Sequence, residues 1–218
     1  MTYARVKRAV DVGFATLALI VLLPVLVGMA ALVAARLGRP VLFHQVRAGR
    51  HGSSFTFVKF RTMRQVDPTR GLLTDADRLT RLGRFLRSTS LDELPSLWNV
   101  VRGEMSLVGP RPLPVRYLQR YTVEQARRHE VRPGMTGLAQ VRGRNALSWE
   151  RKFALDVAYV ESRSVTLDLR ILFETLVTVV RRNGIAAGGH ATAPEFLGGG
   201  AAKGVDMTNM PRPGKPCQ

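Results

Sequence analysis

The chain has 218 residues, which suffices for one ordinary hydrophobic core, or for a modest domain with a membrane segment, but hardly for two large domains. Its 33 Lys and Arg residues outnumber its 16 Asp and Glu residues, and the formal net charge of +17 favours anionic partners: phosphate groups, acidic lipid headgroups or nucleic acid. The only cysteine, Cys217, excludes an internal disulfide framework and a clustered thiolate metal site.

Residues 12–35 carry no charge and predict a membrane segment. About 24 residues of helix, at about 1.5 Å each, would reach about 36 Å, which is enough to cross a bilayer. A cleaved signal peptide fits poorly, because the apolar run is too long and no clear small-residue cleavage site follows it.

This segment can be arranged in the membrane in two ways, as a straight span or as a re-entrant hairpin. Basic residues flank it on both sides, at Arg5, Lys7 and Arg8 and at Arg36, Arg39, Arg47 and Arg50. Lys and Arg favour the cytoplasmic side of a membrane. A straight span would place one basic flank on the opposite side, whereas a re-entrant hairpin keeps both ends on the cytoplasmic side. Pro24, in mid-segment, removes a main-chain donor and predicts a bend there. A kinked straight anchor stays open as the alternative.

The rest of the chain is predicted to be mostly helical with one small β-hairpin. Residues 40–45 and 55–63 have the composition of short strands, with a turn at 49–53. Apolar residues recur at helical spacing over 77–102, and this basic amphipathic stretch would either rest on a membrane or form ordinary surface helices. Further helices are expected at 114–128, 148–161 and 167–182.

The expected organisation is a membrane helix with basic flanks at 1–39, a catalytic domain at 40–198 and a mobile tail at 199–218 that is rich in Gly, Ala and Pro. Four aromatic residues are either core residues or interfacial anchors, and most of them are interpreted as core: Trp98, Trp149, Phe153 and Tyr159. His129 and His190 are too isolated to predict a metal site.

The acidic pair Asp92 and Glu93 is the candidate catalytic centre. Ser90 followed by Glu93 also fits a capping box, so the pair alone is weak evidence. Five basic residues stand beside turns or element ends, where their side chains could converge near the acidic pair on one anion: Lys59, Arg61, Arg87, Arg111 and Arg144. On a strand, Lys59 and Arg61 would share the face opposite the apolar one, as phosphate ligands or as solvated charges. Arg111 stands between two prolines and is either a preorganised phosphate ligand or a solvated loop residue.

Ordered blocks along most of the chain resemble the small monotopic phosphoglycosyl transferases, which are bacterial polyprenyl-phosphate sugar-1-phosphate transferases. The blocks include Lys7-Arg8-x-x-Asp11, Phe43-x-Gln45-x-Arg47-x-Gly49, Lys59-Phe60-Arg61-Thr62-Met63, Ser90-Leu91-Asp92-Glu93-Leu94-Pro95, Asn99-Val100, Met105-Ser106-Leu107-Val108-Gly109-Pro110-Arg111-Pro112, Arg132-Pro133-Gly134-Met135-Thr136-Gly137, Gly143-Arg144-Asn145 and Asp168-Leu169.

The resemblance implies a re-entrant membrane helix broken near Pro24 and a domain on the cytoplasmic face of the bacterial inner membrane, in contact with phospholipids. The family usually has Ser before that proline, where this chain has Leu23. The resemblance assigns Asp92 as nucleophile and Glu93 as a ligand of Mg²⁺, with a UDP-sugar as donor and undecaprenyl phosphate as acceptor. Residues 189–198 resemble the diacetylbacillosamine-1-phosphate transferase type and point to an N-acetylated amino sugar.

This chemistry suits the residues. A carboxylate with an ordinary pKa near ~4 is ionised at neutral pH and attacks phosphorus without a general base. Because an anion must approach an anion, Mg²⁺ and basic side chains would have to neutralise the phosphate oxygens. A membrane-tethered nucleic-acid binder is the alternative from another class, but no nucleic-acid module is evident, and no nucleic-acid partner is expected. A non-catalytic scaffold for glycan assembly is the third hypothesis.

Overall fold

The computed structural model describes residues 3–143, 146–181 and 195–198, and its architecture is mostly helical with two small sheets, as predicted. The helices are α1 Tyr3–Val21, α2 Leu23–Leu37, α3 Asp75–Arg78, α4 Arg81–Ser88, α5 Leu97–Arg102, α6 Val123–Ala126, α7 Leu138–Arg142, α8 Trp149–Ser162 and α9 Val165–Arg181. The strands are β1 Leu42–Ala48, β2 Ser54–Phe60, β3 Ser106–Val108 and β4 Gly134–Thr136. Short 3-10 helices lie at η1 Arg50–Gly52, η2 Pro68–Arg70, η3 Leu91–Ser96, η4 Val115–Arg120 and η5 Arg127–Glu130.

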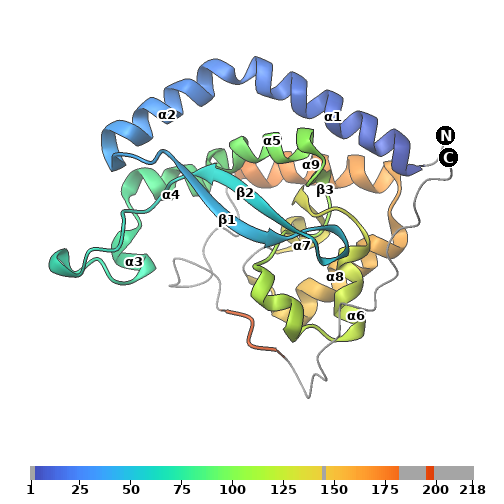
Figure 1. Cartoon of the computed structure of the whole chain (residues 1–218). Helices are drawn as coiled ribbons and strands as arrows, with labels where there is room; N and C mark the ends of the chain where they lie inside the picture. The colour runs from blue at the N-terminus through green and yellow to red at the C-terminus, as the bar shows by residue number, and fades with distance from the viewer. Residues whose placement is uncertain (1–2, 144–145, 182–194, 199–218) are drawn as a thin grey trace, which may run out of the picture.

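Helices α1 and α2 form an arch over the rest of the molecule (Figure 1). They are bent by 63° at a break after Val21, and Pro24 stands in the first turn of α2, which confirms the predicted break. Because proline has no N–H, the carbonyl of Ile20 loses its partner in the helix. Within the described residues no single helix is long and apolar enough to cross a membrane, whereas this bent pair is by length and composition.

One face of the arch is attached to the domain. Ala15 and Asp11 of α1 are buried, and Asp11 accepts hydrogen bonds from Ser106 Oγ at 2.7 Å and from the Leu107 N–H at 3.1 Å. Apolar side chains elsewhere on the two helices remain exposed: Val10, Phe14, Leu17, Ile20, Val21, Leu23, Val25, Val27 and Leu32. The arch therefore has a docked face and an apolar face that none of the described residues covers.

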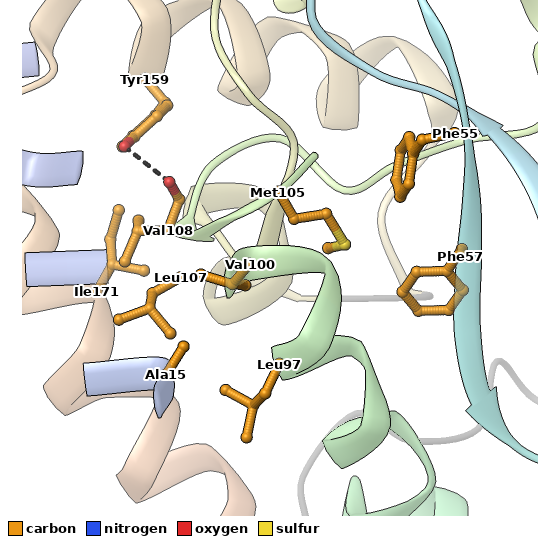
Figure 2. Packing of buried hydrophobic residues seen from close by; sticks show 10 residues of the cluster. All are labelled: Ala15, Phe55, Phe57, Leu97, Val100, Met105, Leu107, Val108, Tyr159 and Ile171. Carbon is orange, nitrogen blue, oxygen red and sulfur yellow. Dashed lines mark hydrogen bonds between the residues drawn. The ribbon is translucent and has the colours of Figure 1, made fainter. Parts of the chain in front are cut away.

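The main core lies between α1, α5, β3, α9 and β2 (Figure 2). Leu97, Val100 and Leu107 pack here with Ile171, and the Tyr159 hydroxyl donates to the Val108 carbonyl at 3.1 Å. Phe153 and Tyr159 are buried and Trp149 packs against a second cluster, so most of the four aromatic residues are core, as expected; Trp98 is the exception and is 53% exposed.

The predicted hairpin is confirmed, with strand ends shifted by a few residues: β1 pairs antiparallel with β2 from Leu42 opposite Phe60 to Ala48 opposite Ser54. By strand alternation, Phe55, Phe57 and Lys59 share one face. Lys59 thus lies opposite Val58 and Phe60, as expected, but its own face carries buried phenylalanines as well. The reason is that both faces of β2 are covered, the second by packing of Phe60 against α2 and α4.

A parallel pair of three-residue strands, β3 and β4, was not predicted. Such short strands leave no readable alternation in the sequence. A Cβ on Gly134 would lie 2.1 Å from the main-chain nitrogen of Gly109, so this close crossing requires glycine.

The predicted helical stretch at 77–102 is divided into several pieces. Thr80 starts α4 by accepting from the Gly83 N–H at 2.9 Å, and Ser90 ends that run with a left-handed φ of 58°. Residues 114–128 are likewise divided among η4, α6 and η5, because Thr122 starts a new capping box. The predicted helices at 148–161 and 167–182 match α8 and α9 closely.

Candidate active site

The acidic pair lies in the first turn of η3, directly after the left-handed Ser90. The Ser90 side chain makes no capping hydrogen bond, and the Glu93 side chain binds Arg111 instead. The capping-box explanation is therefore wrong. A left-handed serine beside two acidic residues is a sparsely populated conformation of the kind that is concentrated at functional sites.

Asp92 is buried, with 4% of its surface exposed, and Lys59 Nζ lies 3.5 Å from its Oδ2. Burial raises the pKa of Asp92, and the negative charge of Glu93 adds to that rise. The charges of Lys59, Arg87 and Arg111 act in the opposite direction. The pKa of Asp92 is thus higher than that of an ordinary carboxylate, and the neighbouring cations stabilise its ionised form.

Glu93 is paired with Arg111 through both carboxylate oxygens, with 3.3 Å between Arg111 Nη1 and Glu93 Oε2 and a second, shorter contact between Nη2 and Oε1. Burial acts to raise the pKa of Glu93, but the charge and hydrogen bonds of Arg111 outweigh it and the pKa is lowered. The Arg111 side chain is 46% exposed, so part of the guanidinium remains open to an anion.

The other predicted phosphate ligands differ in position. Arg87 on α4 donates from Nε to Thr62 Oγ1 at 3.0 Å, and its charge lowers the pKa of Asp92. Arg61 binds the C-terminal carbonyls of α2, at Leu37 and Gly38, so its guanidinium is engaged there and not by the acidic pair. Arg144 lies outside the described residues.

The acidic pair and its basic neighbours line one open cleft of about 1530 Å³. This volume exceeds the ~300–1,000 Å³ of ordinary small-molecule pockets. Phe14, Ala18 and Leu22 of the arch line part of it, and Trp149 and Lys152 of α8 line another part. The cleft therefore offers both apolar walls and a cationic surface around two carboxylates.

Several residues in the quoted blocks support the fold at a distance from the acidic pair. Arg8 donates to the carbonyls of Val100 and Val101 at 2.7 and 2.9 Å, at the end of α5. Asn99 donates to the Thr56 carbonyl at 2.8 Å and so joins α5 to β2. Asp168 accepts from Lys7 Nζ at 2.8 Å.

Sequence reasoning gave no role to Arg128 or Asp156, which form a buried ion pair behind Arg111. These partners stand 28 residues apart, so no local signal in the sequence could have joined them.

Among the described residues, no group of three or more His, Cys, Asp or Glu side chains could hold a metal ion. His129 Nδ1 lies 3.0 Å from the Gly49 carbonyl, and burial lowers its pKa to about 3, so the imidazole is neutral. His190 lies outside the described residues. Within the part of the chain that the structure describes, Asp92 and Glu93 are the adjacent carboxylates that line the cleft near the basic cluster.

A family model described as bacterial sugar transferase matches residues 2–182 of the chain. The uncharacterized sugar transferase EpsL of Bacillus subtilis is 50% identical over 195 residues, which cover 89% of this chain and 96% of that protein. The undecaprenyl-phosphate galactose phosphotransferase of Salmonella typhimurium is 38% identical over 196 residues, which cover 82% of this chain and 41% of that protein.

The UDP-glucose:undecaprenyl-phosphate glucose-1-phosphate transferase of Caulobacter vibrioides is 39% identical over 185 residues, covering 80% of this chain and 69% of that protein. The chain thus spans nearly all of EpsL but about two fifths of the Salmonella relative. These relatives give no support to the resemblance with the diacetylbacillosamine type.

Proposed function

The chain belongs to the bacterial sugar transferase family, and from that premise we propose that it transfers a sugar-1-phosphate from a UDP-sugar to undecaprenyl phosphate. The products are undecaprenyl-diphosphate-sugar and UMP, and the reaction is a first membrane step of glycoconjugate assembly. The observation that carries the proposal is the buried Asp92 beside Glu93, surrounded by Lys59, Arg87 and Arg111 in one cleft.

The names of two relatives support the donor and acceptor classes: one is an undecaprenyl-phosphate galactose phosphotransferase, and the other is a UDP-glucose:undecaprenyl-phosphate glucose-1-phosphate transferase. The identity of the transferred sugar is a separate part of the proposal. Residues 189–198 favour an N-acetylated amino sugar, but most of that segment, 189–194, lies outside the described residues. A panel of UDP-sugars is the direct test.

The proposed mechanism has two displacements at phosphorus. The Asp92 carboxylate attacks the phosphorus that bears the sugar, the bond to the bridging oxygen breaks, and UMP leaves with that electron pair. An oxygen of the acceptor's ionised phosphate then attacks the aspartyl phosphosugar, and the Asp92 carboxylate is released unchanged. Lys59, Arg87 and Arg111 bring positive charge to the oxygens whose negative charge opposes both approaches.

Asp92 and Glu93 are proposed to hold Mg²⁺. Mg²⁺ takes one or two protein carboxylates and completes its shell with waters and substrate phosphates, so a pair without a third acidic ligand fits it. When bound, the ion would neutralise charge on the diphosphate.

The bent pair α1–α2 is proposed to be a re-entrant membrane helix, with the domain on the cytoplasmic face. Its uncovered apolar side chains and its basic flanks support this. The amphipathic α4, where Phe85 is 47% exposed, would rest on the same membrane surface. Phe14 and Leu22 of the arch line the cleft. In this orientation they would lie at the membrane, so the cleft would open beside a lipid-borne acceptor.

The test is intact-protein mass spectrometry of the detergent-purified chain after incubation with Mg²⁺ and single UDP-sugars. We expect a phosphosugar adduct in wild type and in the surface control Glu124→Gln, and none in Asp92→Asn. UMP release that always needs the lipid phosphate, without any adduct, would mean direct transfer. No UMP release with any donor would favour the scaffold, and a salt-sensitive RNA shift retained in Asp92→Asn would favour the nucleic-acid binder.

A further inference from the structure

The loop that carries Arg111 is held by two arginines that donate to consecutive carbonyls. Arg128 Nη2 donates to the Arg111 carbonyl at 2.7 Å, and Arg47 Nη1 donates to the Pro112 carbonyl at 2.7 Å. Pro110 and Pro112 have no N–H, so the loop forms few main-chain hydrogen bonds of its own. Main-chain hydrogen bonds hold the loop on both sides, at Gly109, Pro110 and Leu113, and the two arginine side chains hold Arg111 and Pro112 between them.

The Arg128 guanidinium is held by hydrogen bonds from all three of its nitrogens and by one aromatic contact. Its Nε and Nη2 donate to Asp156 Oδ2 at 3.0 and 2.7 Å, and its Nη1 donates to the Tyr121 hydroxyl at 3.1 Å. The side chains of Arg128 and Asp156 are only 2% and 4% exposed, and the guanidinium carbon lies 5.5 Å from the centre of the Phe153 ring. The planar guanidinium thus joins α8, η5 and the Arg111 loop with one rigid group.

We propose that Arg128, oriented by Asp156, is a positioning residue: it fixes the main chain of Arg111 so that the Arg111 guanidinium stays on Glu93 while a substrate phosphate binds. This inference rests on the proposed function. Arg111 is half exposed and would otherwise have many orientations, whereas its carbonyl is fixed by a buried donor. Orientation of a phosphate-binding cation before the substrate arrives lowers the entropic part of the barrier.

Simple removal of either partner would confuse positioning with stability, because an unpaired buried charge is strongly destabilising. The decisive variant is the double replacement Arg128→Met with Asp156→Leu. A well-packed apolar pair in place of a buried ion pair is often neutral or stabilising. The fold should then survive while the Arg111 carbonyl loses its donor.

A matched control exists in the same two elements. Arg127 of η5 and Glu161 of α8 form an exposed ion pair at 2.7 Å, without contact to the Arg111 loop. Arg127→Gln with Glu161→Gln removes this pair and the partly exposed pairs of Arg127 with Glu124 and Glu130, and it should change neither donor turnover nor thermal stability appreciably.

The experiment measures UMP release and thermal unfolding for both double variants, in the wild-type background and in an Arg111→Lys background. We expect the Arg128→Met/Asp156→Leu variant to lose ~10- to 100-fold in kcat/KM while it still unfolds in one cooperative transition, at a melting temperature lowered by the Arg111 carbonyl that has lost its donor. In the Arg111→Lys background the same replacement should cost at most about 2-fold, because its effect passes through Arg111.

An equal loss in both backgrounds would overturn the proposal, since the ion pair would then act independently of Arg111. An unchanged kcat/KM in the wild-type background would overturn it as well. A wild-type chain that releases no UMP from any UDP-sugar would instead refute the proposed function, so the two failures are distinguishable.

Discussion

Lys59 Nζ lies 3.5 Å from Asp92 Oδ2, and the aspartate is almost fully buried. Burial raises the pKa of Asp92, while Lys59 lowers it. Only the ionised carboxylate is a nucleophile, so activity falls as pH falls through this pKa. The acid limb of the kcat/KM profile should therefore lie above the ~3.9 of an ordinary aspartate.

Replacement of Lys59 by Met removes a charge that lowers the pKa of Asp92, so the acid limb should move to higher pH. The measurement is UMP release against pH for wild type, Lys59→Met and the exposed control Arg81→Met on α4, whose limb should not move. A Lys59→Met limb at the wild-type position, or below it, would show that the lysine charge does not act on Asp92.

The pairing of Glu93 with Arg111 leads to a second prediction, on Mg²⁺. Because Glu93 is ionised and adjacent to Asp92, Glu93→Gln should raise the Mg²⁺ concentration for half-maximal UMP release by ~10- to 100-fold. Chelation with EDTA should abolish wild-type UMP release, and added Mg²⁺ should restore it. Wild-type release that is unaffected by EDTA would contradict the metal proposal. The control Glu124→Gln should keep the wild-type Mg²⁺ dependence.

The sequence was sufficient where a feature is local. Uniform apolar composition predicted α1 and α2, Pro24 predicted their bend, and helical spacing predicted α8 and α9. The positions of Lys59, Arg87 and Arg111 at turns or element ends suggested convergence, and all three line the cleft of Asp92. These inferences need only the neighbouring residues and the period of the backbone.

The sequence was insufficient where the fold joins distant segments. The Arg128 and Asp156 pair and the β3–β4 crossing depend on contacts across 28 residues or more. Arg61 shared every local property of Lys59, yet the end of α2 offers it unpaired carbonyls, and those carbonyls determine its orientation. The left-handed Ser90 likewise has no signal in composition.

Asp11 attaches the arch to the domain, which predicts a stability effect. Asp11→Ala would leave the Ser106 hydroxyl without its carboxylate acceptor and the buried Leu107 N–H without a partner. An unsatisfied buried group costs ~1–3 kcal/mol, so the melting temperature in detergent should fall. Asp75→Asn, which alters a half-exposed carboxylate on α3, should have little effect. An unchanged melting temperature for Asp11→Ala would show that the attachment is not needed.

The proposed re-entrant arrangement of α1 and α2, which are bent by 63°, makes a prediction about membrane topology. In a re-entrant arrangement, a residue before the segment and a residue of the domain lie on the same membrane face. Arg5 is exposed on α1 and Glu124 on α6, which lies on the opposite side of the molecule from the arch (Figure 1). Single cysteines at these positions, in a Cys217→Ser background, can therefore report on both sides of the segment.

Both Arg5→Cys and Glu124→Cys should react with a membrane-impermeant maleimide in inside-out vesicles and remain protected in intact spheroplasts. The basic residues at both ends of the segment are the reason, since each end favours the cytoplasmic side. A kinked anchor that crosses the bilayer would give opposite labelling patterns for the two positions. Labelling of both cysteines in intact spheroplasts would place the domain on the outer face, where a nucleotide sugar made in the cytoplasm could not reach Asp92.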